Sequence, residues 1–133
     1  MKLDDICAAW APRLLSVLRI ISALVILQYG LTKLFGFPYS EDLSFQPAFS
    51  LYWDAAIFEF VGGTLLLIGV FTRYAAFVLS GETAAAYFID HAPHGFFPML
   101  NDGDLPVMFS FVFLFIAAAG AGPWSVDALL KKK

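Results

Sequence analysis

A glutamate that opens a long apolar run is the feature that most constrains this chain. Residues 59–73 are almost entirely apolar, yet they begin at Glu59 and end at Arg73. An ionisable side chain inside a membrane span costs roughly 2.5–3.5 kcal/mol on insertion scales, so it should face protein or water. Gly62 and Gly63 follow one helical turn later, and small residues let a second helix approach closely. The run therefore predicts a membrane helix with one polar, closely packed face.

The composition agrees with an integral membrane protein. The chain has 133 residues, of which 60% are hydrophobic and 14% are charged. Soluble domains have roughly 45–50% apolar and 25% charged residues. We expect a single membrane domain over residues 1–133, with no room for a large soluble domain. Cys7 is the only cysteine, so the chain holds no internal disulfide or dithiol redox pair.

Four apolar runs predict four transmembrane helices. They cover about residues 13–34, 52–71, 74–90 and 105–121. Backbone polar groups in lipid must be hydrogen-bonded within the segment, so all four runs should be helical. The sequence thus predicts an all-α four-helix bundle. Thr72 and Arg73 lie between the second and third runs, where we expect a very tight turn.

Charge segregation predicts the orientation of these helices. With four spans, one side carries the basic residues Lys2, Arg13, Arg73, Lys131, Lys132 and Lys133. The other side carries the acidic residues Glu41, Asp42, Asp90, Asp102 and Asp104. Because basic loops stay on the cytoplasmic side, both termini should be cytoplasmic.

A stripe of polar or small residues runs along each of the first three predicted helices. The candidate site residues on these stripes are Arg19, Lys33, Glu59 and Glu82. We expect Arg19 to reach Glu82 or Glu59, and Glu59 to be buried against the first helix at its paired glycines. Lys33 lies near the outer rim, where its side chain can snorkel toward water. Two interpretations remain open: a charge network that fixes helix register, or a polar site for a quinone, a proton or a small ligand.

Other motifs are weaker. His91 and His94 lie close to several aspartates, but Pro93 disrupts helical spacing and no cysteine assists. We therefore expect hydrogen-bonding histidines in a loop cap and no metal site. The sequence has no glycine-rich phosphate loop, no nucleophile elbow and no basic aromatic patch for nucleic acid. It identifies no catalytic residue.

Several motifs together resemble the DoxX family over nearly the whole chain. They are Leu-Arg-Ile at 18–20 with Gly-Leu-Thr-Lys-Leu at 30–34, Glu-Phe-Val-Gly-Gly at 59–63, Gly-Val-Phe-Thr-Arg-Tyr-Ala-Ala at 69–76, His-Ala-Pro-His-Gly-Phe-Phe-Pro at 91–98, and Gly-Pro-Trp-Ser-Val-Asp at 122–127. The chain departs from the family pattern at residues 101–104, which read Asn-Asp-Gly-Asp.

The resemblance implies a small, multi-pass protein of the bacterial inner membrane. Relatives are associated with quinone-linked sulfur oxidation and with complexes that manage thiol and oxidative stress. Three functions are compatible with this: a membrane subunit of a quinone-linked redox complex, a non-catalytic anchor or assembly scaffold, and a small transporter or permeability element. A quinone is the candidate cofactor, with no cofactor bound covalently. The expected partners are the lipid bilayer and either another protein or further copies of the chain.

Overall fold

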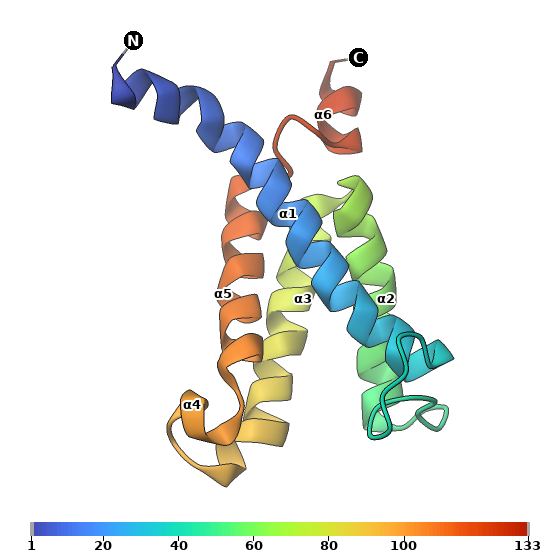
Figure 1. Cartoon of the computed structure of the whole chain (residues 1–133). Coiled ribbons are helices and arrows are strands. Elements are labelled where there is room, and N and C mark those ends of the chain that lie inside the picture. Colours follow the sequence, from blue (N-terminus) through green and yellow to red (C-terminus); the bar gives the residue numbers. More distant parts are fainter. Residues whose placement is uncertain (1, 133) are drawn as a thin grey trace.

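The regular structure of residues 2–132 is entirely helical. The computed structural model describes residues 2–132, which contain helices and no strands. The four long helices are α1 (Leu3–Phe35), α2 (Leu51–Ile68), α3 (Thr72–Ala86) and α5 (Asp104–Ala119) (Figure 1). Four short elements accompany them: the π-helix η1 (Tyr87–His91), the 3-10 helix η2 (Ala92–His94), α4 (Pro98–Asn101) and α6 (Val126–Lys131).

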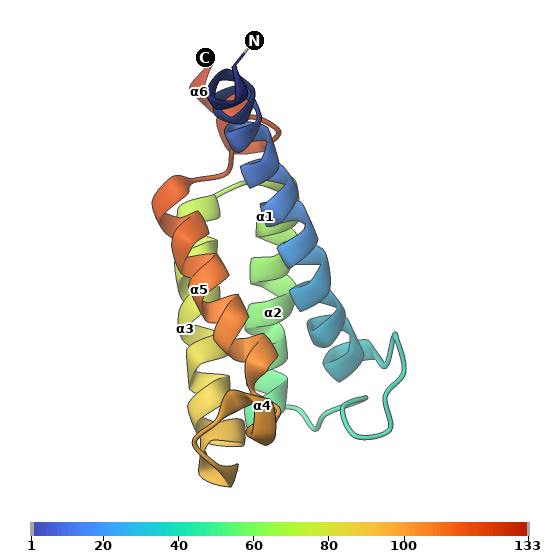
Figure 2. The same ribbon diagram turned by 60° about the vertical axis from the view of Figure 1, so that its left-hand side comes forward.

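The long helices form two packed pairs. α1 lies along α2, and α3 lies along α5 (Figure 2). Ser80 and Ser110 tie the second pair together, because each hydroxyl donates to the other residue's carbonyl oxygen, at 2.7 Å and 3.0 Å. The N- and C-termini lie at the same end of the bundle (Figure 1). We call this the termini end, and the opposite end, with residues 36–50 and 92–103, the loop end.

The distribution of polarity is that of a protein surrounded by lipid. Large apolar side chains are exposed on all four long helices, for example Ile21, Phe58, Phe77, Phe111 and Phe115. Charged and hydroxyl side chains are buried inside, among them Arg19, Lys33, Glu59, Ser80 and Thr83. By length and composition α1 and α2 could each cross a membrane, and α5 is a shorter apolar helix. The apolar exterior and polar interior suit contact with a bilayer.

The second and third helices meet at a turn that differs from the expected one. α2 ends at Gly69, which adopts a left-handed conformation with a φ of 73°. A left-handed glycine is a common helix C-cap, because glycine has no Cβ to clash. The turn therefore occupies residues 69–71, and Thr72 and Arg73 already belong to α3. The prediction of a turn at Thr72 and Arg73 was wrong because it overlooked this stop signal. α1 also differs, since it begins at Leu3 and continues through Pro12.

Two glycines set the close approach of α1 and α2. A Cβ atom added to Gly30 would lie 2.9 Å from the backbone nitrogen of Phe60 and 3.1 Å from the carbonyl oxygen of Ala56. One added to Gly63 would lie 3.2 Å from Cβ of Leu27. Gly63 thus faces α1 as expected, and backbone nearly touches backbone at Gly30.

Gly62 does not share this face. A Cβ atom there would lie 2.9 Å from Cγ of Leu79 in α3. The paired glycines therefore serve two different neighbours, because adjacent residues on a helix point in different directions.

Gly30→Ala should destabilise the bundle. The added methyl group would meet backbone atoms of α2 that cannot rotate away, and such overpacking costs about 1–3 kcal/mol. The matched control is Gly81→Ala in α3, because a Cβ at Gly81 meets nothing within 4 Å. Chemical unfolding in detergent measures both variants. Equal stability of Gly30→Ala and the wild type would contradict the contact.

Candidate functional site

A buried ion pair joins α1 to α2 near the loop end. The Lys33 ammonium donates to both oxygens of Glu59, at 2.9 Å and 3.1 Å. Lys33 is 7% exposed and Glu59 is 4% exposed. The burial of Glu59 against α1 is therefore as expected. A buried charge pair of this kind is strongly interdependent, because the loss of one partner leaves the other uncompensated.

A second acid, Glu82 of α3, lies on the same side of the interior. Its Oε2 atom is buried and accepts no hydrogen bond from the described residues, and the Glu59 carboxylate lies close enough to share a proton with Glu82. Lys33 already serves Glu59, so no cation is left for Glu82 within hydrogen-bond distance in residues 2–132. Burying an ionised carboxylate without a partner is costly. Glu82 is thus suited to bind a proton or a hydrogen-bond donor.

A common cavity of about 420 Å³ is bordered by Lys33, Glu59 and Glu82. It lies between the two helix pairs and is lined by residues of α1, α2, α3, η1 and α5 and of the connecting loops. Its walls combine apolar side chains, such as Ile26, Leu105 and Phe109, with Lys33, Glu59 and Glu82. An apolar cavity with a few convergent polar groups is the usual form of a small-molecule site.

A second cavity of about 260 Å³ adjoins the first. It lies between α2 and α3, where Phe58 and Val78 border it. The two cavities share Lys33, Tyr52, Glu82, Ala86 and Asp90. Since Phe58 and Val78 are exposed apolar residues, this space leads from the interior to the outer apolar surface.

Tyr52 and Asp90 close the loop end of this shared wall. The Tyr52 hydroxyl donates to Asp90 at 2.9 Å. The Lys33 ammonium lies 5.9 Å from the centre of the Tyr52 ring, within reach of a cation–π interaction. Tyr52 was not among the predicted site residues, although it precedes Glu59 by seven positions and so lies on the same helical face. Asp90 lies in the π-helical turn η1, which no sequence pattern indicated, and lines this wall.

Arg19 does not belong to this site, so the predicted contact with Glu82 or Glu59 is wrong. Its Nε donates to the carbonyl oxygen of Leu66 at 2.8 Å, and its Nη2 donates to that of Trp124 at 2.7 Å. Nη1 donates to the carbonyl oxygen of Ala121. Carbonyl groups at helix C-termini lack intrahelical partners and favour nearby cations. Arg19 therefore clamps the end of α2 and the segment after α5 to α1.

The expectation for Lys33 was also wrong, because its side chain does not snorkel to water. The loop of residues 36–50 folds back over the end of α1. The backbone nitrogen of Gln46 donates to the carbonyl oxygen of Lys33 at 2.9 Å, and the Thr32 hydroxyl donates to that of Pro38 at 2.6 Å. Leu43 of this loop lines the cavity. The covered lysine turns inward to Glu59.

The structure bears out only part of the expectation for the histidines, since they end the short helices η1 and η2 and only His91 forms a hydrogen bond among the described residues. His91 Nδ1 is 2.9 Å from the carbonyl oxygen of Asn101, and its ring stacks on Tyr87. The Asn101 amide also donates to the carbonyl oxygen of Gly95 at 2.8 Å. His91 lines the cavity, whereas His94 is exposed. Within residues 2–132, no three His, Cys, Asp or Glu side chains gather in a way that could hold a metal ion.

The arrangement can hold a polar head group inside an apolar surround. Lys33 has three N–H donors and uses two of them on Glu59. Glu82 presents a carboxyl oxygen without a partner among the described residues. Asp90, His91 and Asp102 line the loop end of the cavity, so titratable groups extend from Glu82 toward the aqueous loops. The site can thus hydrogen-bond a ligand and exchange protons with it.

Comparisons with known proteins give the family. Residues 14–92, more than half of the chain, match the DoxX family, and this stretch contains Lys33, Glu59 and Glu82. An uncharacterized protein of Haemophilus influenzae is 38% identical over 128 residues, which cover 93% of this chain and 96% of that protein. A second uncharacterized protein of the same organism is 33% identical over 97 residues, which cover 72% of this chain and 62% of the relative. No solved structure matches the chain.

The family match and the apolar exterior of the fold both indicate a membrane protein. The resemblance drawn from the motifs is confirmed, and α1 and α2 have the length and composition of membrane spans. The chain belongs to the DoxX family and is a membrane protein.

Proposed function

We propose that the protein is a multi-pass subunit of a quinone-linked redox complex, and that its loop-end cavity binds the quinone head group. The observation that carries this proposal is the unpartnered, buried Oε2 of Glu82 beside the Lys33–Glu59 pair. The volume of about 420 Å³ lies within the roughly 300–1,000 Å³ of small-molecule sites. The adjoining space between α2 and α3 suits an apolar tail that enters from lipid.

The polar groups have separate roles in this proposal. The third N–H of Lys33 donates to one quinone carbonyl oxygen, and Glu82 donates a proton to the reduced oxygen. Asp90 and His91 return a proton to Glu82 from the aqueous loops, since both line the same cavity. Reduction of a quinone to a quinol takes two electrons and two protons. In this proposal a partner redox protein supplies the electrons.

The proposed setting is the bacterial inner membrane, with four spans and both termini in the cytoplasm. The shared termini end (Figure 1) and the segregation of basic residues support this orientation. When fused after the last lysine, a reporter that works in the cytoplasm should be active, and a reporter that works in the periplasm should be inactive. Activity of a periplasmic reporter there would reverse the orientation.

Quinone binding should weaken by about two- to tenfold when Glu82 is replaced by Leu. This substitution removes a hydrogen bond whose net contribution is about 0.5–1.5 kcal/mol. Ala86→Phe should have a similar effect, because Ala86 lines both cavities and the larger ring would fill the space between them. The measurement is a titration of the purified chain in lipid nanodiscs with a short-chain ubiquinone.

Gly81→Ala is the matched control for both variants. It changes the neighbouring residue of α3, at a position with open space around it. The control should bind quinone like the wild type. Wild-type protein that binds no quinone, or binding that is equal in all variants, contradicts the proposal.

The scaffold function is the second candidate, and the position of Arg19 favours it. Every hydrogen bond that Arg19 donates goes to a backbone carbonyl oxygen. The charge of Arg19 is therefore structural. If the Lys33–Glu59 pair has the same purpose, the bundle is an anchor for a partner complex. Intact assembly with a partner in Glu82→Leu protein, together with no quinone binding by the wild type, would establish this alternative.

A further inference from the structure

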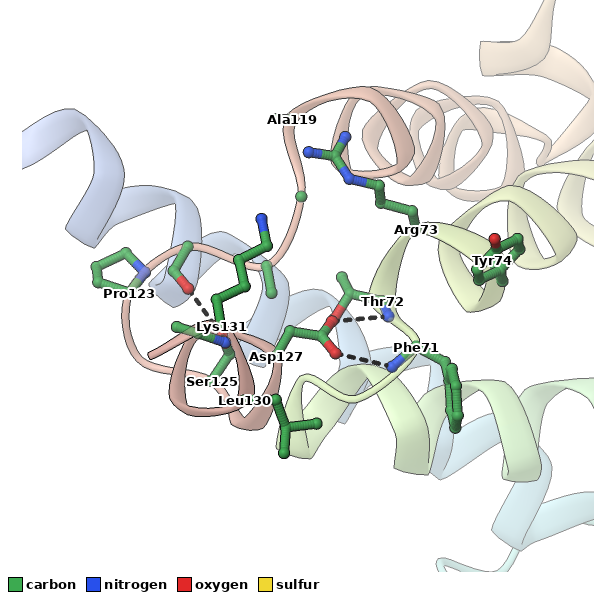
Figure 3. A pocket seen from close by; sticks show the side chains of 14 residues that line it. Phe71, Thr72, Arg73, Tyr74, Ala119, Pro123, Ser125, Asp127, Leu130 and Lys131 are labelled. Carbon is green, nitrogen blue, oxygen red and sulfur yellow. Dashed lines mark hydrogen bonds between the residues drawn. The ribbon is translucent and has the colours of Figure 1, made fainter. Parts of the chain in front are cut away.

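A separate cavity of about 570 Å³ lies at the termini end, on the opposite side of the hydrophobic core from the candidate quinone site. Its wall comes from the start of α3, from the segment after α5 and from α6 (Figure 3). None of Lys33, Glu59 and Glu82 lines it. What this cavity binds is therefore independent of the proposed quinone site.

Two basic side chains border this cavity from different elements. Arg73 extends from the start of α3, and Lys131 extends from α6 (Figure 3). The Arg73 guanidinium is positioned by its Nη1, which donates to the carbonyl oxygens of Ala117, at 3.2 Å, and of Ala118. Among the described residues, Nη2 of Arg73 and the Lys131 ammonium form no hydrogen bond or ion pair with the protein. Both cations can thus donate to a ligand.

The single carboxylate in the cavity does not neutralise both cations. Asp127 accepts hydrogen bonds from the backbone nitrogens of Phe71, at 3.1 Å, and Thr72, at 3.0 Å (Figure 3). Burial opposes its ionisation, but the hydrogen bonds from Thr72 and Phe71 and the charge of Lys131 lower the pKa of Asp127 overall. The ionised carboxylate caps the N-terminus of α3. The cavity keeps one excess positive charge.

The rim of the cavity is apolar and exposed. Phe71, Tyr74 and Leu130 are 64%, 76% and 56% exposed, and all three line it. A free phosphate ion makes no favourable contact with such an apolar rim. A phospholipid has acyl chains to cover it, and Arg and Lys side chains are the usual partners of its phosphate. Basic pockets between membrane helices on the cytoplasmic side bind the head groups of anionic lipids.

We infer that this cavity binds the head group of an anionic phospholipid, with its phosphate between Arg73 and Lys131 and its acyl chains against Phe71, Tyr74 and Leu130. Anionic lipids are preferred over zwitterionic ones because the head group of the latter brings its own cation. The site holds the termini end of the bundle at the membrane surface.

Native mass spectrometry of the purified full chain tests the inference. Phosphatidylglycerol should bind about fivefold more tightly than phosphatidylcholine with the same acyl chains. Lys131→Gln should remove most of this preference, since it deletes one of the two free cations without removing a hydrogen bond within the described residues. Lys132→Gln is the matched control, because it makes the same charge change next to the cavity without lining it. The control should keep the preference.

Three results would overturn the inference. The first is equal binding of the two lipids by the wild type. The second is an equal loss of preference in Lys131→Gln and Lys132→Gln, which indicates a diffuse charge effect. The third is complete displacement of phosphatidylglycerol by inorganic phosphate that also binds lipid-free protein, which indicates a site for free anions. Arg73→Gln gives an independent second variant, and its unfolding curve shows whether the protein remains folded.

Discussion

Replacing Arg19 by Met should lower the free energy of unfolding by at least about 3 kcal/mol. Arg19 is 1% exposed, and its guanidinium donates to the carbonyl oxygens of Leu66, Ala121 and Trp124. Each hydrogen bond to a charged group contributes about 1.5–3 kcal/mol, and Met leaves all three carbonyls without this partner. Chemical unfolding of the purified chain in detergent measures the loss.

The same substitution should release the end of the chain. Ser16 supports the clamp, because its hydroxyl accepts from the backbone nitrogen of Trp124 at 3.1 Å and donates to the carbonyl oxygen of Ala121 at 3.2 Å. Limited proteolysis of Arg19→Met protein should therefore cut between residues 120 and 125 before it cuts the helices. Arg19→Lys should be intermediate, since one ammonium cannot reproduce the planar fork of the guanidinium. Wild-type stability and proteolysis in Arg19→Met would show that the clamp is unimportant.

Replacing Lys33 by Met should destabilise the protein by about 3–5 kcal/mol. This is the usual cost when one partner of a buried ion pair is removed and the other charge stays behind. The effect is expected to be large here because Glu82 contributes a second acid to the same cavity. Glu59→Leu should cost less, since Glu82 borders the same cavity and can compensate part of the Lys33 charge. Equilibrium unfolding in detergent measures both variants.

A double-mutant cycle distinguishes the Lys33–Glu59 pair from the contact between Arg19 and Glu59 that the sequence predicted. Lys33→Met combined with Glu59→Leu should be less destabilising than the sum of the single changes, with a coupling of about 1–3 kcal/mol. Arg19→Met combined with Glu59→Leu is the control cycle, and it should be additive because Arg19 makes no contact with Glu59. Additivity in the first cycle, or strong coupling in the second, would contradict the structure.

The sequence predicted the helices and the interior position of Glu59 because these follow from local composition and from the cost of charge in lipid. The predicted positions of the helix ends were less accurate. Gly69 ends α2, and the chain resumes as helix at Thr72, so the turn falls earlier than expected. The start of α1 was not predicted, since residues 3–12 lie outside its apolar run.

The charge partners could not be predicted from the sequence, because they depend on how loops and ends return to the bundle. Arg19 binds backbone carbonyl oxygens, and a carbonyl group leaves no signature in the amino-acid sequence. Lys33 is buried because the loop of residues 36–50 covers it, and loop conformation is not periodic. A helical projection places Tyr52 on the same face as Glu59, but its partner Asp90 lies in the π-helical turn η1, which the sequence pattern did not indicate.

The site and the clamp divide the interior charges of the bundle between two roles. The clamp of Arg19 and Ser16 joins the ends of the helices at one end of the bundle. Lys33, Glu59 and Glu82 border a cavity at the other end, and one carboxyl oxygen remains without a partner among the described residues. The cavity and its spare acid are what favour a ligand site over a scaffold.

Labelling with a photoreactive quinone tests this account most directly. The purified chain in nanodiscs is illuminated with the labelled quinone, with and without excess ubiquinone, and the modified peptides are sequenced by mass spectrometry. The account predicts modification at the cavity wall, in the segments that contain Tyr52, Glu82 and Phe109, and its suppression by ubiquinone. Labelling that ubiquinone does not suppress, or that falls only on the exposed start of α1, would contradict it.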